Sequence, residues 1–187
     1  MKTLYRIFLM IILFQIHMHA QFSIRGGVNF NSVTSGAFKR IGFNEDKYMF
    51  TGYYAGIGTY DESGGYEFEY AYLKANAKYK NQDREINMHN ITLSILLPIE
   101  SSSRISFDFR GDMGIGILDI GVNGVFRTGL DINLFLSRNL SLFASGMLNL
   151  GYAYFSSPYS DNLYEISESF DGLTSGPEIK TGVRLIF

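Results

Sequence analysis

The sequence predicts an all-β chain: an eight-stranded antiparallel up-and-down transmembrane β-barrel preceded by a cleavable signal peptide. Three observations predict this fold class. The N-terminus has the charge and hydropathy of an export signal, the rest of the chain alternates between apolar and polar residues, and eight segments alternate in this way. Successive side chains of a strand point to opposite faces, so a period of two separates an apolar face from a polar one.

The N-terminal segment predicts export. Lys2 and Arg6 precede an apolar run at 7–16, and Ala20 precedes Gln21. A positive start, a short apolar stretch and a small residue before the cut are typical of a secretory signal peptide. The run is shorter than the roughly 20 residues that a membrane-spanning helix needs. We therefore expect cleavage after about Ala20, with residues 1–20 as signal peptide and residues 21–187 as one barrel domain.

Composition narrows the class of protein further. The chain has no cysteine, which excludes a disulfide framework, a thiolate metal site and a lipid-anchored cysteine after the signal. Loss of Lys2 and Arg6 with the signal changes the net charge from −2 to −4, which is too mildly acidic to suggest a nucleic-acid partner. The 20 glycines, the 13 tyrosines and 16 phenylalanines, and the scarcity of proline favour strands over disorder.

The clearest predicted strand covers residues 104–117. Its apolar face carries Ile105, Phe107, Phe109, Met113, Ile115 and Ile117, whereas its other face carries Arg104, Ser106, Asp108, Arg110 and Asp112. A helix would mix these two sets on every side, but a strand separates them. The same alternation predicts strands at 22–31, 52–60, 66–73, 90–97, 126–136, 140–154 and 179–187.

The connections between these strands differ in length. Short polar turns are expected around 61–65, 100–103 and 137–139, and longer segments at 33–49, 74–89 and 155–176, with 118–125 intermediate. Short turns on one side and long loops on the other are typical of an outer-membrane barrel. The short turns and both termini would then face the periplasm.

The polar faces of the predicted strands are small and charged. We expect them to form a lumen polar network of Arg25, Glu67, Glu69, Arg104, Asp108, Arg110, Asp112, Arg127, Asp131, Lys180 and Arg184. The two signs nearly balance, as enclosed charges must, because an unpaired buried charge is costly. Tyr66, Tyr70, Tyr72, Tyr152 and Tyr154 near strand ends would form the aromatic girdles. A soluble lipocalin-like barrel would instead turn the apolar faces inward, and it remains an alternative.

These residues carry a resemblance to a known family. The Ala20–Gln21 junction, the stretch FSIRGGVNF at 22–30, EYAY at 69–72 and the final KTGVRLIF resemble the small outer-membrane β-barrel domain family, the PorT-like and OmpX/OmpA-like eight-stranded barrels. The resemblance implies residence in the bacterial outer membrane. It also implies that the terminal Phe187 is the signal read by the barrel-assembly machinery. It does not assign the secretion role of PorT.

Several side chains are candidates for functional sites. His89, the one histidine after the signal, could with Asp83 or Glu85 serve a lipid-modifying enzyme, although an exposed rim histidine is the simpler interpretation. The acids Asp161, Glu165, Glu168 and Asp171 could bind a cation or a partner, or simply be solvated. Lys74, Lys78, Lys80 and Arg84 could neighbour lipopolysaccharide phosphates. Arg110-Gly111-Asp112 spells an adhesion tripeptide but falls inside a strand.

The sequence therefore favours a structural or interaction protein whose long loops form the contact surface. An eight-stranded barrel has a lumen that side chains can fill, and the charged set together with Tyr54 and Phe143 would leave little bore. A narrow porin-like pore for small solutes is the alternative. We assign no catalytic residue, cofactor or metal. The expected partners are outer-membrane lipids and lipopolysaccharide, the barrel-assembly machinery and an unidentified protein, with no nucleic acid.

Overall fold

The computed structural model describes residues 21–187 except 62, 103 and 156–169. The predicted signal peptide, residues 1–20, lies outside the described residues. The strands are β1 (Gln21–Thr34), β2 (Lys47–Asp61), β3 (Gly64–Tyr79), β4 (Gln82–Ser101), β5 (Ile105–Leu118), β6 (Gly121–Ser137), β7 (Leu140–Phe155) and β8 (Phe170–Ile186). A short helix, α2 (Gly36–Arg40), follows β1.

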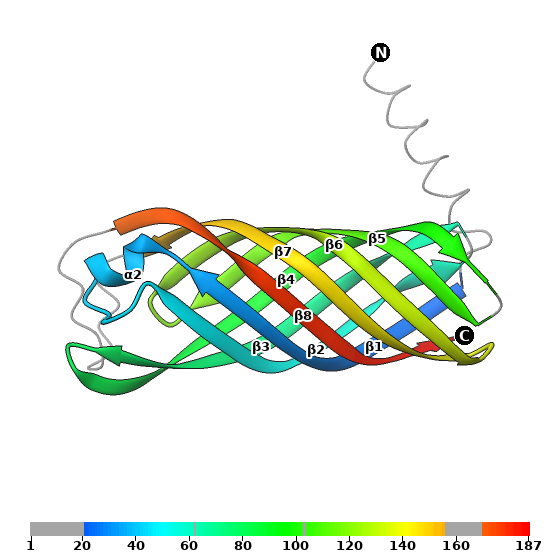
Figure 1. Cartoon of the computed structure of the whole chain (residues 1–187), viewed down its shortest axis with the longest axis horizontal. Helices are drawn as coiled ribbons and strands as arrows, with labels where there is room; N and C mark the ends of the chain where they lie inside the picture. The colour runs from blue at the N-terminus through cyan, green and yellow to red at the C-terminus, as the bar shows by residue number, and fades with distance from the viewer. Residues whose placement is uncertain (1–20, 62, 103, 156–169) are drawn as a thin grey trace, which may run out of the picture.

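The eight strands form one closed barrel (Figure 1). Each strand pairs antiparallel with the next, and β1 also pairs with β8. Closure pairs backbone N–H and C=O groups between strands, which lipid could not satisfy. The predicted eight-stranded antiparallel up-and-down barrel is confirmed.

The barrel has two different ends. At the turn end, two or three residues join β2 to β3, β4 to β5 and β6 to β7, and the C-terminal Phe187 lies there too. The predicted short turns are confirmed. At the loop end lie α2, the β3–β4 hairpin and the β5–β6 connection (Figure 1). Among the described residues, no helix has the length and hydropathy that crossing a bilayer requires.

The expected long loop at 74–89 is wrong. β3 continues to Tyr79 and β4 begins at Gln82, so only Lys80 and Asn81 connect them, with φ values of 47° and 66°. Such positive φ angles at both central residues match the twist of a tight hairpin. The period of two persists through this region, but the outward side chains become polar and the inward ones apolar. That exchange made two strands resemble a polar loop.

Other strand ends also differ from the expectation. β1 continues to Thr34, so the predicted loop at 33–49 shrinks to the segment that contains α2. Only Asp119 and Ile120 separate β5 from β6, where a longer connection was expected. β8 begins at Phe170, earlier than the predicted start at 179. In each case, polar or glycine residues near the strand end made the alternation hard to recognise. Pairing with the neighbouring strand nevertheless extends the strand through these residues.

The outward face of the barrel is broadly apolar. Side chains of every strand contribute to it, including Ile24, Phe30, Ile57, Phe68, Leu93, Met113, Phe126, Leu130, Leu148 and Ile179, all of which are exposed. An exposed apolar surface of this extent is not found on soluble monomers. The soluble lipocalin-like alternative is therefore wrong, because that fold needs its apolar side chains inside.

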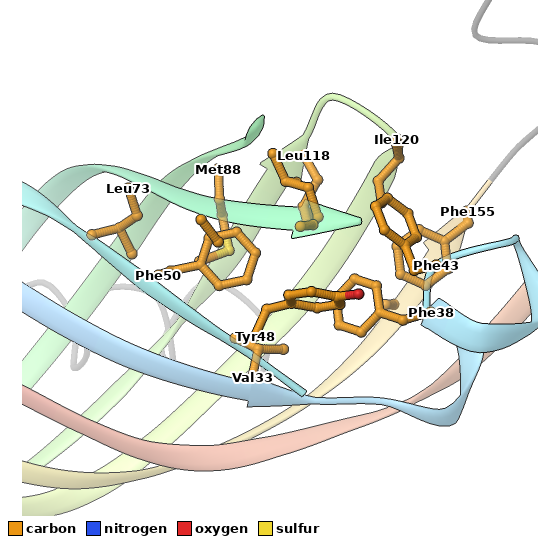
Figure 2. Close-up of a cluster of buried hydrophobic side chains, with 14 of the residues drawn as sticks. Val33, Phe38, Phe43, Tyr48, Phe50, Leu73, Met88, Leu118, Ile120 and Phe155 are labelled. Carbon is orange, nitrogen blue, oxygen red and sulfur yellow. The ribbon is translucent and has the colours of Figure 1, made fainter. Parts of the chain in front are cut away.

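The interior at the loop end is an apolar core, which the sequence analysis did not anticipate. Phe50 of β2, Leu73 of β3 and Met88 of β4 point inward and are buried (Figure 2). Phe38 of α2 belongs to the same buried cluster and meets the Tyr48 ring edge-on, with centroids 5.2 Å apart. Ser35 caps α2 by accepting a hydrogen bond from the Ala37 N–H at 3.3 Å. The helix thus closes the loop end of the barrel with apolar side chains.

Candidate functional site

The middle of the lumen holds a buried charge network. The structure places there ten of the eleven predicted residues, namely Arg25, Glu67, Glu69, Asp108, Arg110, Asp112, Arg127, Asp131, Lys180 and Arg184, each at most 1% exposed. They come from five of the eight strands, β1, β3, β5, β6 and β8, and reach the lumen because the period of two turns every second side chain inward. The network is thus assembled from residues that are far apart in sequence.

Glu67 of β3 is the centre of the network. Its Oε2 accepts hydrogen bonds from Arg110 Nη1 at 2.9 Å and from Arg25 Nη1 at 3.2 Å. Its Oε1 accepts one from Arg184 Nη2 at 2.8 Å. A single carboxylate therefore joins guanidinium groups of β1, β5 and β8.

Arg110 of β5 distributes its donors among three carboxylates. Besides Glu67, its Nε donates to Asp112 Oδ1 at 2.8 Å and its Nη2 to Glu69 Oε2 at 3.1 Å. Glu69 in turn accepts a hydrogen bond from Lys180 Nζ of β8. Such charge-assisted bonds offset part of the cost of removing these groups from water.

Asp131 of β6 completes the centre of the lumen. It accepts a hydrogen bond from Arg25 Nη1 at 2.5 Å. The Arg25 guanidinium also stacks on the ring of Phe143, with its Cζ 3.5 Å from the ring centroid. Phe143 meets Tyr54 edge-on, with centroids 6.1 Å apart. Both rings are buried in the lumen beside the charged side chains.

The turn end of the lumen is closed differently. Asp108 accepts hydrogen bonds from Tyr60 Oη and from Asn133 Nδ2, both at 2.8 Å. Below them Tyr60, Leu96 and Ile186 form a small buried apolar cluster, with Phe135 packed against it. The charge network is therefore separated from solvent by an apolar layer.

Toward the loop end, uncharged polar side chains separate the charges from the apolar core. Asn29 Nδ2 donates to Glu178 Oε1 at 2.9 Å, and Thr174 Oγ1 donates to Asn123 Oδ1 at 3.2 Å. Asn149 Nδ2 approaches Asn31 Oδ1 at 3.4 Å. From turn end to loop end, the lumen thus passes from apolar to charged, to amide-rich, and to apolar again.

Arg104 is a correction to the predicted network. It lies in the turn between β4 and β5 and is exposed, outside the buried network. β5 begins only at Ile105, because Ser102 closes the turn by accepting a hydrogen bond from the Ile105 N–H at 3.1 Å. The strand rule therefore did not apply to Arg104.

Glu178 is a lumen residue that the sequence analysis missed. It is fully buried, and its Oε2 lies 2.7 Å from Nε of Arg127. The predicted last strand began one residue later, at 179. The inward position of Glu178 could have been predicted by extending the period of two from Arg184 and Lys180 toward the N-terminus. With Glu178, the lumen holds five cationic and six carboxylate side chains.

His89 does not face the lumen. It points outward from β4, where its Nδ1 lies 2.7 Å from Tyr70 Oη and its ring packs against Tyr72, with centroids 5.1 Å apart. Tyr72 Oη donates to Asn87 Oδ1 at 2.7 Å. The carboxylate that the enzyme hypothesis placed beside His89 is thus replaced by two tyrosines, which suit an interfacial position more than a catalytic one.

The other candidate residues are distributed as follows. Arg110 and Asp112 of the adhesion tripeptide are buried in the lumen. Lys74, Lys78 and Lys80 lie on or beside the β3–β4 hairpin and are exposed, whereas Arg84 is half-buried. Of the acidic set, Asp171 accepts a hydrogen bond from Tyr152, and Asp161, Glu165 and Glu168 lie outside the described residues. Within the described part of the chain, no three carboxylate or histidine side chains are grouped to hold a metal ion.

The turn end carries an open cavity of about 950 Å³. Tyr60, Phe135 and Ile186 line its inner part, and Arg104 and Arg138 stand among its outer residues. Because Tyr60 and Ile186 belong to the apolar layer, this cavity ends where the lumen is closed.

An apolar outward face around a sealed polar interior defines a transmembrane β-barrel of the outer-membrane class. Neisserial surface protein A (NspA) has the same fold, with a TM-score of 0.54 and 14% identity over 89% of this chain and 97% of its own. OprG, an outer membrane protein of Pseudomonas aeruginosa, gives a TM-score of 0.51 and 12% identity over 90% of this chain and 96% of its own. No family model and no curated protein sequence matches the chain.

Proposed function

We propose that this protein is a structural or interaction protein of the bacterial outer membrane, with a sealed lumen and its loop end as the contact surface. The outward apolar face supports its place in the membrane. By the convention of outer-membrane barrels, the turn end faces the periplasm and the loop end the cell exterior. The observation that carries the proposal is the filling of the lumen from the apolar layer near the turn end to the apolar core at the loop end.

A pore is disfavoured by the same observation. A solute would have to pass the apolar layer of Tyr60 and Leu96, then the ion pairs around Glu67, then the apolar core around Phe38. Opening such a path would break several buried ion pairs at once, which is costly because each charge would lose its partner. Binding at the surface requires none of this.

Cell fractionation and bilayer recordings test this proposal together. The full chain should be recovered in outer membranes, with an electrophoretic mobility that changes on boiling. The purified barrel should give no steady conductance in planar bilayers, under conditions in which a known porin conducts. Recovery as a soluble protein would contradict the membrane assignment, and a reproducible open channel would contradict the sealed lumen.

The C-terminus supports a role for Phe187 in assembly. Phe187 is 64% exposed, and its ring lies beside that of Phe22 at the turn end, with ring centroids 6.0 Å apart. A terminal aromatic side chain on the outside of the last strand is accessible to the barrel-assembly machinery before closure. In this proposal the machinery reads Phe187.

Phe187→Ala should therefore lower the folded barrel recovered from cells severalfold, while leaving refolding of purified protein in detergent unchanged. Heat-dependent gel mobility measures the folded fraction in both settings. Phe22→Ala is the matched control, since it removes the neighbouring ring at the same end. An equal loss for both variants in cells would mean that the ring contact matters and not recognition.

A further inference from the structure

The outward side chains change from aromatic to polar at one level on two neighbouring strands, β2 and β3. On β2 the outward side chains pass from Tyr53 to Thr51, and on β3 from Tyr72 to Lys74. The register pairs Tyr53 with Tyr72 and Thr51 with Lys74, so both transitions lie at the same height. Aromatic girdles mark the membrane–water interface. The lipid headgroups of the outer leaflet therefore lie beside Thr51 and Lys74.

The interior changes in the opposite sense at about this level. Inward side chains of β3 pass from Glu69 to Ala71 and Leu73, and those of β4 from Asn90 to Met88. Above the girdle, apart from the exposed Met49, the wall therefore has polar side chains outside and apolar ones inside, as in a soluble barrel. Its apolar core keeps this part of the wall folded beyond the bilayer (Figure 2).

The wall opens between β2 and β3 just above the girdle. Pairing of the two strands ends at Thr51 and Lys74, and residues 47–50 are not paired with residues 75–78. A recess of about 490 Å³ occupies this position, and Lys47, Met49, Thr51, Lys74 and Asn76 line it together with the carboxylates of Glu45 and Glu85. Contact resumes farther out, where Phe43 bridges to Tyr79.

Four side chains of the recess can donate hydrogen bonds to a phosphate group, beside the carboxylates of Glu45 and Glu85. Lys47 and Lys74 bring two ammonium groups to it, while Thr51 and Asn76 add a hydroxyl and an amide that can donate hydrogen bonds. Lys74 Nζ is held 3.1 Å from Glu85 Oε2, with both side chains about half exposed. An exposed pair of this kind is weak, so the ammonium group remains available to a phosphate. Basic side chains beside a membrane surface favour anionic headgroups.

We propose that the recess between β2 and β3 binds a phosphate of the phosphorylated glycolipid of the outer leaflet, with Lys47 and Lys74 as its ligands. The inference rests on the proposed orientation in the outer membrane. Acyl chains of the same lipid would lie below, on Tyr53 and the apolar face of the barrel. Unpaired strand edges could instead recruit a peptide strand, but lysines at an edge oppose such pairing.

Binding of bisphosphorylated lipid A to the purified, detergent-folded barrel tests the proposal by native mass spectrometry. The wild type should bind it about tenfold more tightly than dephosphorylated lipid A, and Lys47→Gln/Lys74→Gln should abolish that preference. Arg104→Gln/Arg138→Gln is the matched control, because it removes two exposed cations at the turn end. Equal binding of both lipids by the wild type, or a preference retained by the lysine variant, would overturn the proposal.

A second variant separates a specific ligand from general surface charge. Lys74→Gln/Glu85→Gln leaves the net charge unchanged but removes one proposed phosphate ligand, and it should lower lipid A binding severalfold. Unchanged binding would overturn the role of Lys74. Heat-dependent mobility of every variant shows that the barrel is folded. Because outer-membrane recovery is measured independently, failure of this inference is distinguishable from failure of the proposed function.

Discussion

Replacing Glu67 with glutamine should lower the free energy of unfolding of the barrel by about 3–5 kcal/mol, as expected when a buried ion pair loses one partner. Glu67 accepts hydrogen bonds from Arg25, Arg110 and Arg184, and all four side chains are buried. A neutral amide would leave these guanidinium groups with less compensating charge. Since the chain has no tryptophan, urea titration followed by gel mobility of the folded form is the suitable measurement.

Two further variants test whether the loss of stability comes from the buried charge network. Glu100→Gln, at an exposed position of β4 near the turn end, is the control and should change stability by less than about 0.5 kcal/mol. Glu67→Gln/Arg184→Gln should cost less than the sum of the single changes, because the two side chains share one interaction. If Glu67→Gln behaved like Glu100→Gln, the network would not contribute to stability as described.

The second large effect is expected at the seam that closes the barrel. Gly27 of β1 pairs with Gly182 of β8. A Cβ atom at Gly182 would lie 2.0 Å from the Gly26 carbonyl oxygen, and one at Gly27 would lie 2.0 Å from the Thr181 carbonyl oxygen. Both distances are far below van der Waals contact and both involve backbone, so side-chain rotation cannot relieve them.

Gly182→Val should therefore destabilise the barrel by about 3 kcal/mol or more and reduce the heat-shifted, closed form. Gly146→Val is the control, since a Cβ atom at Gly146 meets nothing within 4 Å. Both substitutions add the same side chain to a strand, but Gly182 lies on the inward face with backbone close by, whereas Gly146 faces outward into open space. Comparable folding yields for the two variants would contradict a close contact at the β1–β8 seam.

The alternation of apolar and polar residues predicted most of the lumen residues but not all of them. It correctly assigned Arg25, Asp131 and Lys180 to the inward face, because the face of a strand residue is a local property. It gave Arg104 the wrong position, since a turn hydrogen bond ends the strand rule there. It also missed Glu178, whose neighbours Pro177 and Gly176 interrupt the pattern at the start of the predicted strand.

The loop end shows a different limit. Residues 74–89 continue the period of two, but Lys74 and Lys78 lie outside and Ala75 and Ile86 inside. This arrangement is the reverse of the pattern lower in the same strands, because the surroundings change from lipid to water. A prediction that assumes lipid on the outer side therefore gave a polar loop here, although β3 and β4 continue through this region.

The sequence by itself determined that this protein is a membrane β-barrel with eight strands, an apolar outer face and a charged interior. These properties follow from the local geometry of a strand and from the requirement that lipid-exposed backbone be paired. Only the tertiary structure decided that Glu67 meets arginines of β1, β5 and β8, that α2 closes the loop end, and that β2 and β3 part above the girdle. Those contacts depend on strand register and on what stands across the lumen, which a single strand does not encode.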